Sequence, residues 1–134
     1  MMYDLVNKNF AGECIAMFKR WLENRNVGKT FADYLTEYGF KTIAIFDAGE
    51  IGQLLYAEVK NSEIEVKYFI DRNAEGIRTI DGIPVIQPNI IEKMEVVDLV
   101  LVSPVFDYVQ VSKLFVDINP RIGTISMKDA VYEF

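Results

Sequence analysis

Two carboxylates and two glycines follow an apolar stretch in the first half of the chain. The residues after Thr42–Phe46 read Asp47-Ala48-Gly49-Glu50-Ile51-Gly52. A strand that runs through glycines into a helix presents free backbone amides, and the positive end of the helix dipole, to an anion such as phosphate. Gly49 would let a ligand approach the backbone, and Gly52 would let the helix and strand pack closely. The spacing therefore predicts a phosphate-binding turn at residues 47–52.

An aspartate occupies the first position of this pattern. Dinucleotide-binding turns read Gly-x-Gly-x-x-Gly, and Asp47 stands where the first glycine would turn tightly against a pyrophosphate. Together with Glu50, it places two carboxylates beside the first amides of the helix, where they can cap the N–H groups and repel a second anion. Two interpretations therefore stay open: retained nucleotide binding, and a turn closed by its own carboxylates.

Polar residues also follow two other predicted strands. Asp71 and Arg72 follow the second strand, and Ser103 follows the fourth. Asp71 lies 22 residues after Gly49, near the usual offset of the acidic residue that accepts hydrogen bonds from a ribose, although it also fits a plain polar strand end. Ligands of such sheets bind beyond the carboxyl ends of the strands, where the strand order reverses. The candidate cofactor-binding residues are Asp47, Ala48, Gly49, Glu50, Ile51, Gly52, Asp71, Arg72 and Ser103.

Catalytic and metal-binding patterns are absent from the sequence. A short-chain hydride-transfer site needs a tyrosine and a lysine four residues apart, and Tyr108 has Ser112 at that position. Asp107 and Tyr108 fit a helix N-terminal acid and a helix face better than they fit catalytic roles. The chain has no histidine and a single cysteine, Cys14, which excludes an intrachain disulfide and a thiolate cage for a metal. We therefore predict no catalytic residue and no metal site.

Composition narrows the class of protein. The 134 residues suit one domain, and 51% hydrophobic with 25% charged residues is ordinary for a globular protein. A net charge of -6 without a basic cluster argues against nucleic acid as a partner. No run of about 18 apolar residues predicts a membrane span, and residues 1–10 do not read as a signal peptide. A cytoplasmic setting is the simplest expectation.

The elements that position the candidate residues alternate between strands and helices from residue 41 onward, which is typical of a parallel sheet covered on both faces. Residues 73–87 read as an irregular excursion with turns at 75–76 and 81–82, ending in a short strand. Helices are predicted over 50–60, from 88 through 91, and over 105–118, with a short one at the end of the chain. The predicted sheet has about five strands, at 42–46, 66–70, 84–86, 97–102 and 122–127.

Two helices are predicted before the first strand. The earlier one covers 11–24, and its apolar residues are expected to share a buried face: Cys14, Ile15, Phe18, Trp21 and Leu22. Thr30 and Asp33 form a capping-box pattern that begins the second helix, which ends near Gly39. We predict that residues 1–40 are a helical extension packed on the sheet and that residues 41–134 are the α/β domain.

Three segments resemble one known family: residues 43–52, Tyr68-Phe69-Ile70-Asp71, and Ile80-Asp81-Gly82-Ile83-Pro84-Val85-Ile86. They are similar to the small Rossmann-type nucleotide-binding domains of bacterial cell-surface polysaccharide biosynthesis, which accompany sugar acetyltransferases, sugar epimerases or dehydratases, and glycosyltransferases. The resemblance covers roughly residues 30–134 and implies a three-layer, Rossmann-like fold. It implies nucleotide contacts at Gly49, Gly52 and Asp71 and supplies no catalytic residue. The family usually has glycine where Asp47 stands.

The resemblance implies a nucleotide- or nucleotide-sugar-binding module in surface-polysaccharide metabolism, without chemistry of its own. The candidate ligands are NAD and a nucleotide sugar. That the chain binds no cofactor at all is the remaining alternative. A second copy of the chain and a polysaccharide-biosynthesis enzyme are the candidate partners. The first alternative is a non-catalytic interaction or regulatory subunit that has a degenerate nucleotide pocket and works through an apolar surface around the N-terminal helices. The second is a small NAD-dependent oxidoreductase.

Overall fold

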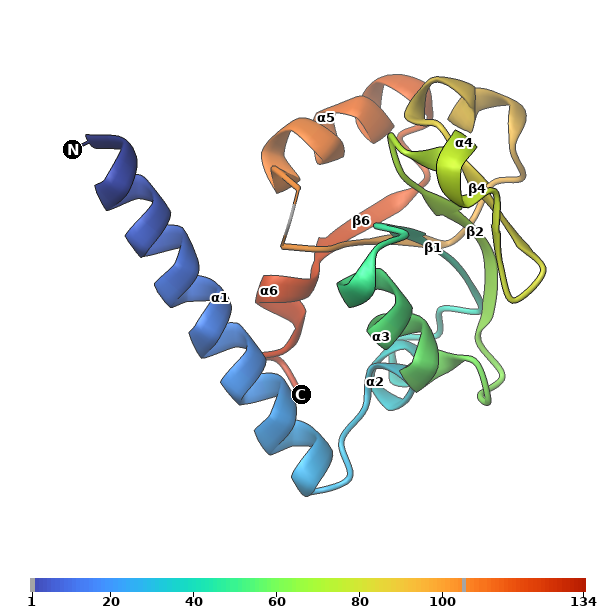
Figure 1. Cartoon of the computed structure of the whole chain (residues 1–134). Helices are drawn as coiled ribbons and strands as arrows, with labels where there is room; N and C mark the ends of the chain where they lie inside the picture. Colours follow the sequence, from blue (N-terminus) through green and yellow to red (C-terminus); the bar gives the residue numbers. More distant parts are fainter. Residues whose placement is uncertain (1, 105) are drawn as a thin grey trace.

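The computed structural model describes residues 2–104 and 106–134, with side-chain environments from residue 12 onward. Six strands form one sheet in the order β3-β4-β2-β1-β5-β6. All neighbouring strands run parallel except β3, which is antiparallel to β4. Helices lie on both sides of the sheet, and α1 runs along the outside of the molecule (Figure 1). The chain is therefore an α/β protein with a mixed, mostly parallel sheet.

Apart from the short elements α4 and β3, which fall in the segment predicted to be irregular, the elements follow one another as the alternating pattern predicts. In chain order they are α1 (Met2–Asn26), α2 (Phe31–Glu37), β1 (Thr42–Phe46), α3 (Glu50–Val59), β2 (Glu65–Ile70), α4 (Ala74–Ile77), β3 (Thr79–Ile80), β4 (Ile83–Ile86), the 3-10 helix η1 (Pro88–Lys93), β5 (Leu99–Val102), α5 (Tyr108–Ile118), β6 (Gly123–Ser126) and α6 (Met127–Ala130).

The helix predicted over 105–118 begins later than expected. The Asp107 carboxylate accepts hydrogen bonds from the amides of Val109 (3.0 Å) and Gln110 (3.4 Å), which makes Asp107 the N-cap of α5. Helical periodicity alone does not mark this start, because the apolar pattern continues upstream of the cap. Val105, the first residue of the predicted helix, lies outside the described residues.

The sheet has one strand more than predicted. The extra strand, β3, pairs with β4 in a short hairpin across Asp81 and Gly82. Both turn residues have positive φ, 52° and 77°, the conformation of tight hairpin turns that favour Asp-Gly. The same dipeptide indicated only a turn in the sequence, because the two-residue strand Thr79–Ile80 is too short to show an alternating pattern.

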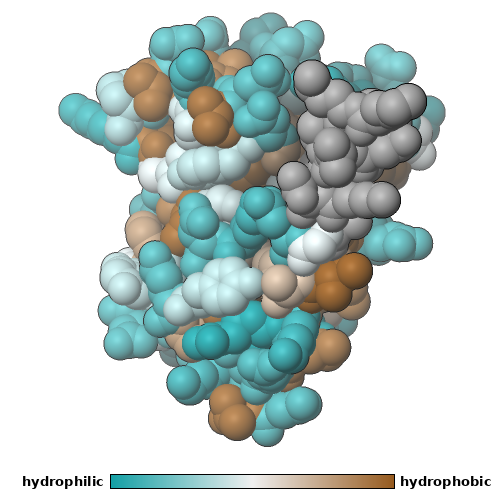
Figure 2. Space-filling model, turned by 90° about the vertical axis from the view of Figure 1, so that its left-hand side faces the viewer, coloured by the Kyte–Doolittle hydropathy of each residue, from teal (hydrophilic) through white to brown (hydrophobic). Residues whose placement is uncertain are grey.

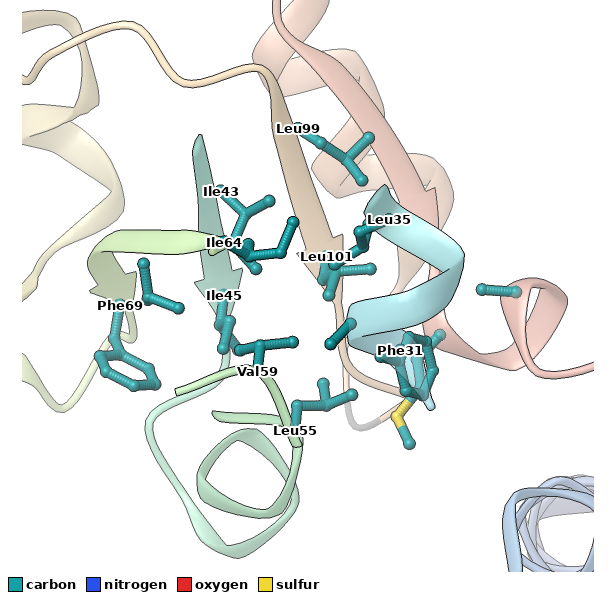
Figure 3. Close-up of a cluster of buried hydrophobic side chains, with 14 of the residues drawn as sticks. Phe31, Leu35, Ile43, Ile45, Leu55, Val59, Ile64, Phe69, Leu99 and Leu101 are labelled. Atoms are coloured by element: carbon teal, nitrogen blue, oxygen red, sulfur yellow. The ribbon is translucent and has the colours of Figure 1, made fainter. Parts of the chain in front are cut away.

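The central strand β1 separates two apolar clusters. Ile43 and Ile45 point into a larger cluster shared with α1, α2, α3 and α6, while Ala44 and Phe46 point into a second cluster beneath η1 and α5. Figure 3 shows part of the larger cluster, in which side chains of α2 and α3 meet those of β1 and β5. This two-sided burial explains why β1 is apolar along its length.

The buried face of α1 differs from the predicted one. Met17 and Trp21 are buried in the larger cluster, and Phe18 packs against it. Ile15 and Leu22, which were expected on this face, are 68% and 59% exposed. The helix is therefore rotated relative to the prediction, so that Met17 and the buried polar residue Asn24 face inward instead. The apolar pattern was right for Trp21 and Phe18 and wrong for Ile15 and Leu22, because an inward asparagine carries no hydrophobic signal.

A nearly buried carboxylate joins the N-terminal helices to α3. Glu58, whose side chain is 6% exposed, accepts hydrogen bonds from the indole N–H of Trp21 (2.5 Å) and from the backbone amide of Phe31 (2.9 Å), and it pairs with Arg25. The Arg25 guanidinium also lies 4.6 Å from the centre of the Trp21 ring. These contacts hold α1 and the start of α2 against α3.

Among the described helices, none is both long enough and apolar enough to pass through a membrane.

Candidate functional site

The strand order reverses beside β1. From β1 the chain moves outward through β2 and β4 on one side, then crosses back to β5 and β6 on the other. The carboxyl ends of β1 and β5, which lie side by side, are therefore the place where this kind of sheet forms a ligand crevice. The turn that connects β1 to α3, residues 47–49, lies at this edge; we call it the β1–α3 turn.

The β1–α3 turn is closed by carboxylates of the chain itself. Asp47 is 4% exposed, and its Oδ1 accepts a hydrogen bond from the amide of Gly49 at 2.6 Å. The amide of Ala48 donates to Oδ2 of Asp71 at 2.9 Å. Two of the amides that the sequence offered to a phosphate thus already have an anionic acceptor. The turn is thus satisfied up to the N-cap residue Gly49, whereas the first turn of α3 has no side-chain cap.

Gly52 is required by close packing of the helix against the strand end. A Cβ atom at this position would lie 1.7 Å from the carbonyl oxygen of Asp47, far inside van der Waals contact. A Cβ atom at Gly49 would lie 3.0 Å from Oδ1 of Asp47, a tight contact with a side chain. Gly52 therefore has the packing role expected of the last glycine of the pattern.

Asp71 follows the end of β2 and contacts the turn, as expected from its position at the carboxyl end of a parallel strand. Its Oδ2 accepts from Ala48, its Oδ1 accepts from the amide of Asn73 at 2.9 Å, and its own amide donates to the carbonyl of Ile86. A carboxylate has about four lone-pair positions, so both oxygens keep some capacity for another donor. Asp71 is thus a structural acceptor of two backbone amides.

Arg72 lies on the other side of the sheet edge, at a cavity of about 260 Å³ that we call the edge cavity. The amide side chain of Gln87 donates to the Arg72 carbonyl at 2.9 Å, which fixes the backbone there. The cavity is open at the carboxyl ends of the strands and reaches the first turns of α5. It is lined by Phe46, Arg72, Pro88, Phe106, Asp107, Gln110, Val111 and Leu114.

The remaining candidates occupy different environments. Ser103 is buried beside the end of β1, where its amide donates to the Phe46 carbonyl at 3.5 Å and its carbonyl accepts from Phe106 at 3.2 Å. Glu50 and Ile51 form the first turn of α3, with Glu50 exposed. The structure thus brings Asp47, Gly49 and Asp71 into contact through Ala48, and it places Arg72 at a separate cavity.

Two features of this edge escaped sequence reasoning. Gln53 reaches back one turn and donates from Nε2 to the Ala48 carbonyl at 3.0 Å, which further closes the β1–α3 turn. The second feature is the edge cavity, whose walls include Phe106, Gln110 and Leu114. The apolar spacing of α5 indicated a buried helix face, and nothing in that pattern distinguishes a packed position from a cavity wall.

The carboxylates at this edge act as acceptors for backbone amides. Asp47, Asp71 and Asp107 each accept at least one such hydrogen bond. Within the described residues, no three or more of the His, Cys, Asp and Glu side chains gather in a way that could hold a metal ion. Comparison of the chain with models of protein families, with curated proteins and with solved structures found no match.

Proposed function

We propose that this chain is a non-catalytic interaction or regulatory module with a Rossmann-like strand arrangement and a degenerate nucleotide pocket. The observation that carries the proposal is the hydrogen bond from the Gly49 amide to Oδ1 of buried Asp47. A carboxylate oxygen stands where a phosphate oxygen would accept from the same amide. The residue that replaces the first glycine thus also takes the place of the ligand.

Electrostatics makes this closure effective against phosphates. Two unit charges 4 Å apart near a protein surface interact by about 4 kcal/mol, which corresponds to roughly a thousandfold in affinity. A phosphate at the start of α3 would meet the carboxylate of Asp47, with Glu50 in the same turn. The helix dipole would offset only part of this repulsion, since it contributes about 0.3–1 kcal/mol at exposed sites.

A partner surface on α1 is part of the proposal. Ile15 and Leu22 are two helical turns apart and are largely exposed on the outer face of this helix. On the side of the molecule that carries α1, apolar residues form separate patches among hydrophilic ones (Figure 2). Such a surface suits a partner that forms both apolar and polar contacts, as reversible interfaces do.

A second candidate is the nucleotide- or nucleotide-sugar-binding module of surface-polysaccharide metabolism. The strand reversal beside β1 and the position of Asp71 at the end of β2 favour it. In this case the ribose would bind Asp71, and the phosphates would lie outside the β1–α3 turn. The two candidates differ in whether a nucleotide stabilises the protein.

A thermal-shift experiment with NAD, UDP and UDP-glucose separates the candidates. We expect no rise in the melting temperature of the wild-type protein. For Asp47→Gly, which removes the charge and restores the glycine, we expect a rise of several degrees, since a ligand at about 100 times its Kd stabilises by about 2.7 kcal/mol. Asp47→Asn is the matched control, because it removes the charge and keeps an acceptor oxygen next to Gly49.

The melting temperatures of the wild-type protein and of Asp47→Gly test different parts of the proposal. A rise with the wild-type protein would favour the nucleotide-binding candidate and overturn the proposal. No rise with Asp47→Gly would show that Asp47 is not what excludes the nucleotide.

Self-association through α1 is tested by measuring the mass of the wild-type protein and of Ile15→Gln/Leu22→Gln over a range of concentrations. A wild-type mass that grows with concentration, and is reduced by the double substitution, supports α1 as a self-association surface; equal masses would remove that form of the proposal.

A further inference from the structure

The edge cavity is a separate site from the β1–α3 turn. Phe46 turns its side chain to the α5 side of β1, whereas Ala48 packs into the cluster on the α3 side. A ligand in the cavity would therefore not need the amides that Asp47 and Asp71 occupy. Ligand binding in the edge cavity is therefore independent of whether the β1–α3 turn is closed to phosphate.

The walls of the edge cavity are suited to a flat apolar group. The rings of Phe46 and Phe106 pack edge to face, with centroids 5.1 Å apart and an angle of 73° between them. Val111, Leu114 and Pro88 complete an apolar lining. Aromatic rings prefer offset or edge-to-face neighbours at 4.5–7 Å, so a ligand ring could extend the pair that is already formed.

The charges at the rim favour a ligand with a single negative charge. Arg72 supplies an exposed guanidinium, and Asp107 supplies a carboxylate whose Oδ1 accepts from the first amides of α5. A carboxylate ligand can form two parallel hydrogen bonds with a guanidinium. A doubly charged phosphate would be attracted by the same arginine but repelled by Asp107. The Gln110 amide adds one neutral polar partner at the rim.

The volume limits the size of the ligand. At about 30 Å³ of liquid volume for each water, 260 Å³ corresponds to roughly nine waters. This space fits one aromatic ring with a carboxylate, and it falls below the 300–1,000 Å³ typical of sites for drug-sized ligands. A dinucleotide is too large to fit into this cavity.

We propose that the edge cavity binds a small aromatic carboxylate, with the ring between Phe106 and Leu114 and the carboxylate on Arg72. The site goes beyond the proposed function, because it assigns a small-molecule ligand to a region that the β1–α3 turn does not include. Recognition requires the ring and the single charge together. An anion without a ring, or a ring without a charge, lacks one of the two contacts.

The test is a titration of the ¹⁵N-labelled full chain with benzoate, followed by amide chemical shifts. We expect saturable shifts at Arg72 and in residues 106–114, with a Kd of about 1 mM or lower for a ligand of this size. Benzyl alcohol and acetate, which supply the ring and the charge separately, are expected to bind at least about tenfold more weakly. Arg72→Gln should weaken benzoate binding by about tenfold.

Arg121→Gln is the matched control, because Arg121 is exposed and does not line the cavity. Its benzoate affinity should equal that of the wild-type protein. The proposal is overturned if benzoate causes no saturable shifts, if they map away from residues 72 and 106–114, or if Arg72→Gln binds as well as the wild type. A rise in the melting temperature of the wild-type protein with a nucleotide would overturn the proposed function and leave this inference intact, so the two can fail separately.

Discussion

At the scale of single residues, aspartates at the carboxyl edge of the sheet serve the backbone. Asp47 and Asp71 hold the amides of Gly49 and Ala48, and Asp107 holds the first amides of α5. Each of these bonds satisfies a donor that would otherwise need water or a ligand. Acidic residues at strand ends are therefore ambiguous: the same side chain can bind a ribose or complete a turn.

Gly52→Ala tests how closely the α3 helix approaches β1. The added methyl group would lie 1.7 Å from the Asp47 carbonyl oxygen, so the helix must shift or the turn must distort. We expect the free energy of unfolding, measured with urea, to fall by about 3 kcal/mol or more. Gly12→Ala is the control: its Cβ would meet nothing within 4 Å in helix α1, so this change should stabilise by about 0.5–1 kcal/mol. Equal effects of the two substitutions would contradict the close approach.

At the scale of elements, the amino ends of β1 and β5 are joined through one carboxylate. Oδ2 of Asp98 accepts from the amides of Lys41 (2.8 Å) and Thr42 (3.1 Å), and the Asp98 amide donates to Oγ1 of Thr42 at 3.1 Å. These bonds lie at the first residue of β1 and directly before β5, where the register of the central pair is set. The register in turn places the carboxyl ends of both strands at the same edge.

This junction predicts a pH dependence of stability. The backbone amides of Lys41 and then Thr42 stabilise the charged form of Asp98 and lower its pKa in the folded state. A carboxyl group whose pKa is lower in the folded state stabilises the fold at pH values above its unfolded pKa, which is near 4. This contribution to the free energy of unfolding is lost as the pH falls through the folded pKa. Asp98→Asn should therefore reduce the free energy of unfolding at neutral pH, and the difference from wild type should shrink below about pH 4. Urea titrations at several pH values measure this difference; a gap that stays constant into the acid range would refute the account.

At the scale of the whole molecule, residues from both ends of the described chain meet around α1. The Asn24 amide donates from Nδ2 to the Val131 carbonyl at 2.8 Å, and Phe134 packs edge to face on Phe31 at 5.0 Å between centroids. Glu58 of α3 binds Trp21 and Arg25 of the same helix. The helix before the sheet is thus held by contacts distant in sequence.

Glu58→Ala tests the attachment of α1. The change leaves the Trp21 indole N–H and the Phe31 amide without their acceptor, so the free energy of unfolding should fall by about 3 kcal/mol. Trp21 is the sole tryptophan of the chain, and its fluorescence reports directly on this contact. Lys19→Ala removes an exposed pair with Glu23 at 3.8 Å in the same helix and should cost less than about 0.5 kcal/mol. A Glu58→Ala loss as small as that of the control would show that the carboxylate does not anchor the helix.

Local patterns were enough to predict the order of the main elements. Strand β1 and helix α3 follow from a continuous apolar run and a helical apolar stripe, and Thr30 caps α2 through the Asp33 amide at 3.2 Å. Each of these signals acts within a few residues, where backbone geometry and solvent exclusion dominate. The role of Gly52 in packing was predictable for the same reason, since the glycine lies only five residues from the carbonyl that it approaches.

Contacts between distant segments decided the rest. The inward face of α1 depends on Asn24 finding a carbonyl 107 residues away, so apolar spacing misplaced Ile15 and Leu22. The sequence alone left open whether Asp47 faces a ligand or its own backbone, because both states use the same residues in the same order. Only the folded chain brings the carboxylates of Asp47 and Asp71 to the amides of one turn, and this proximity closes it.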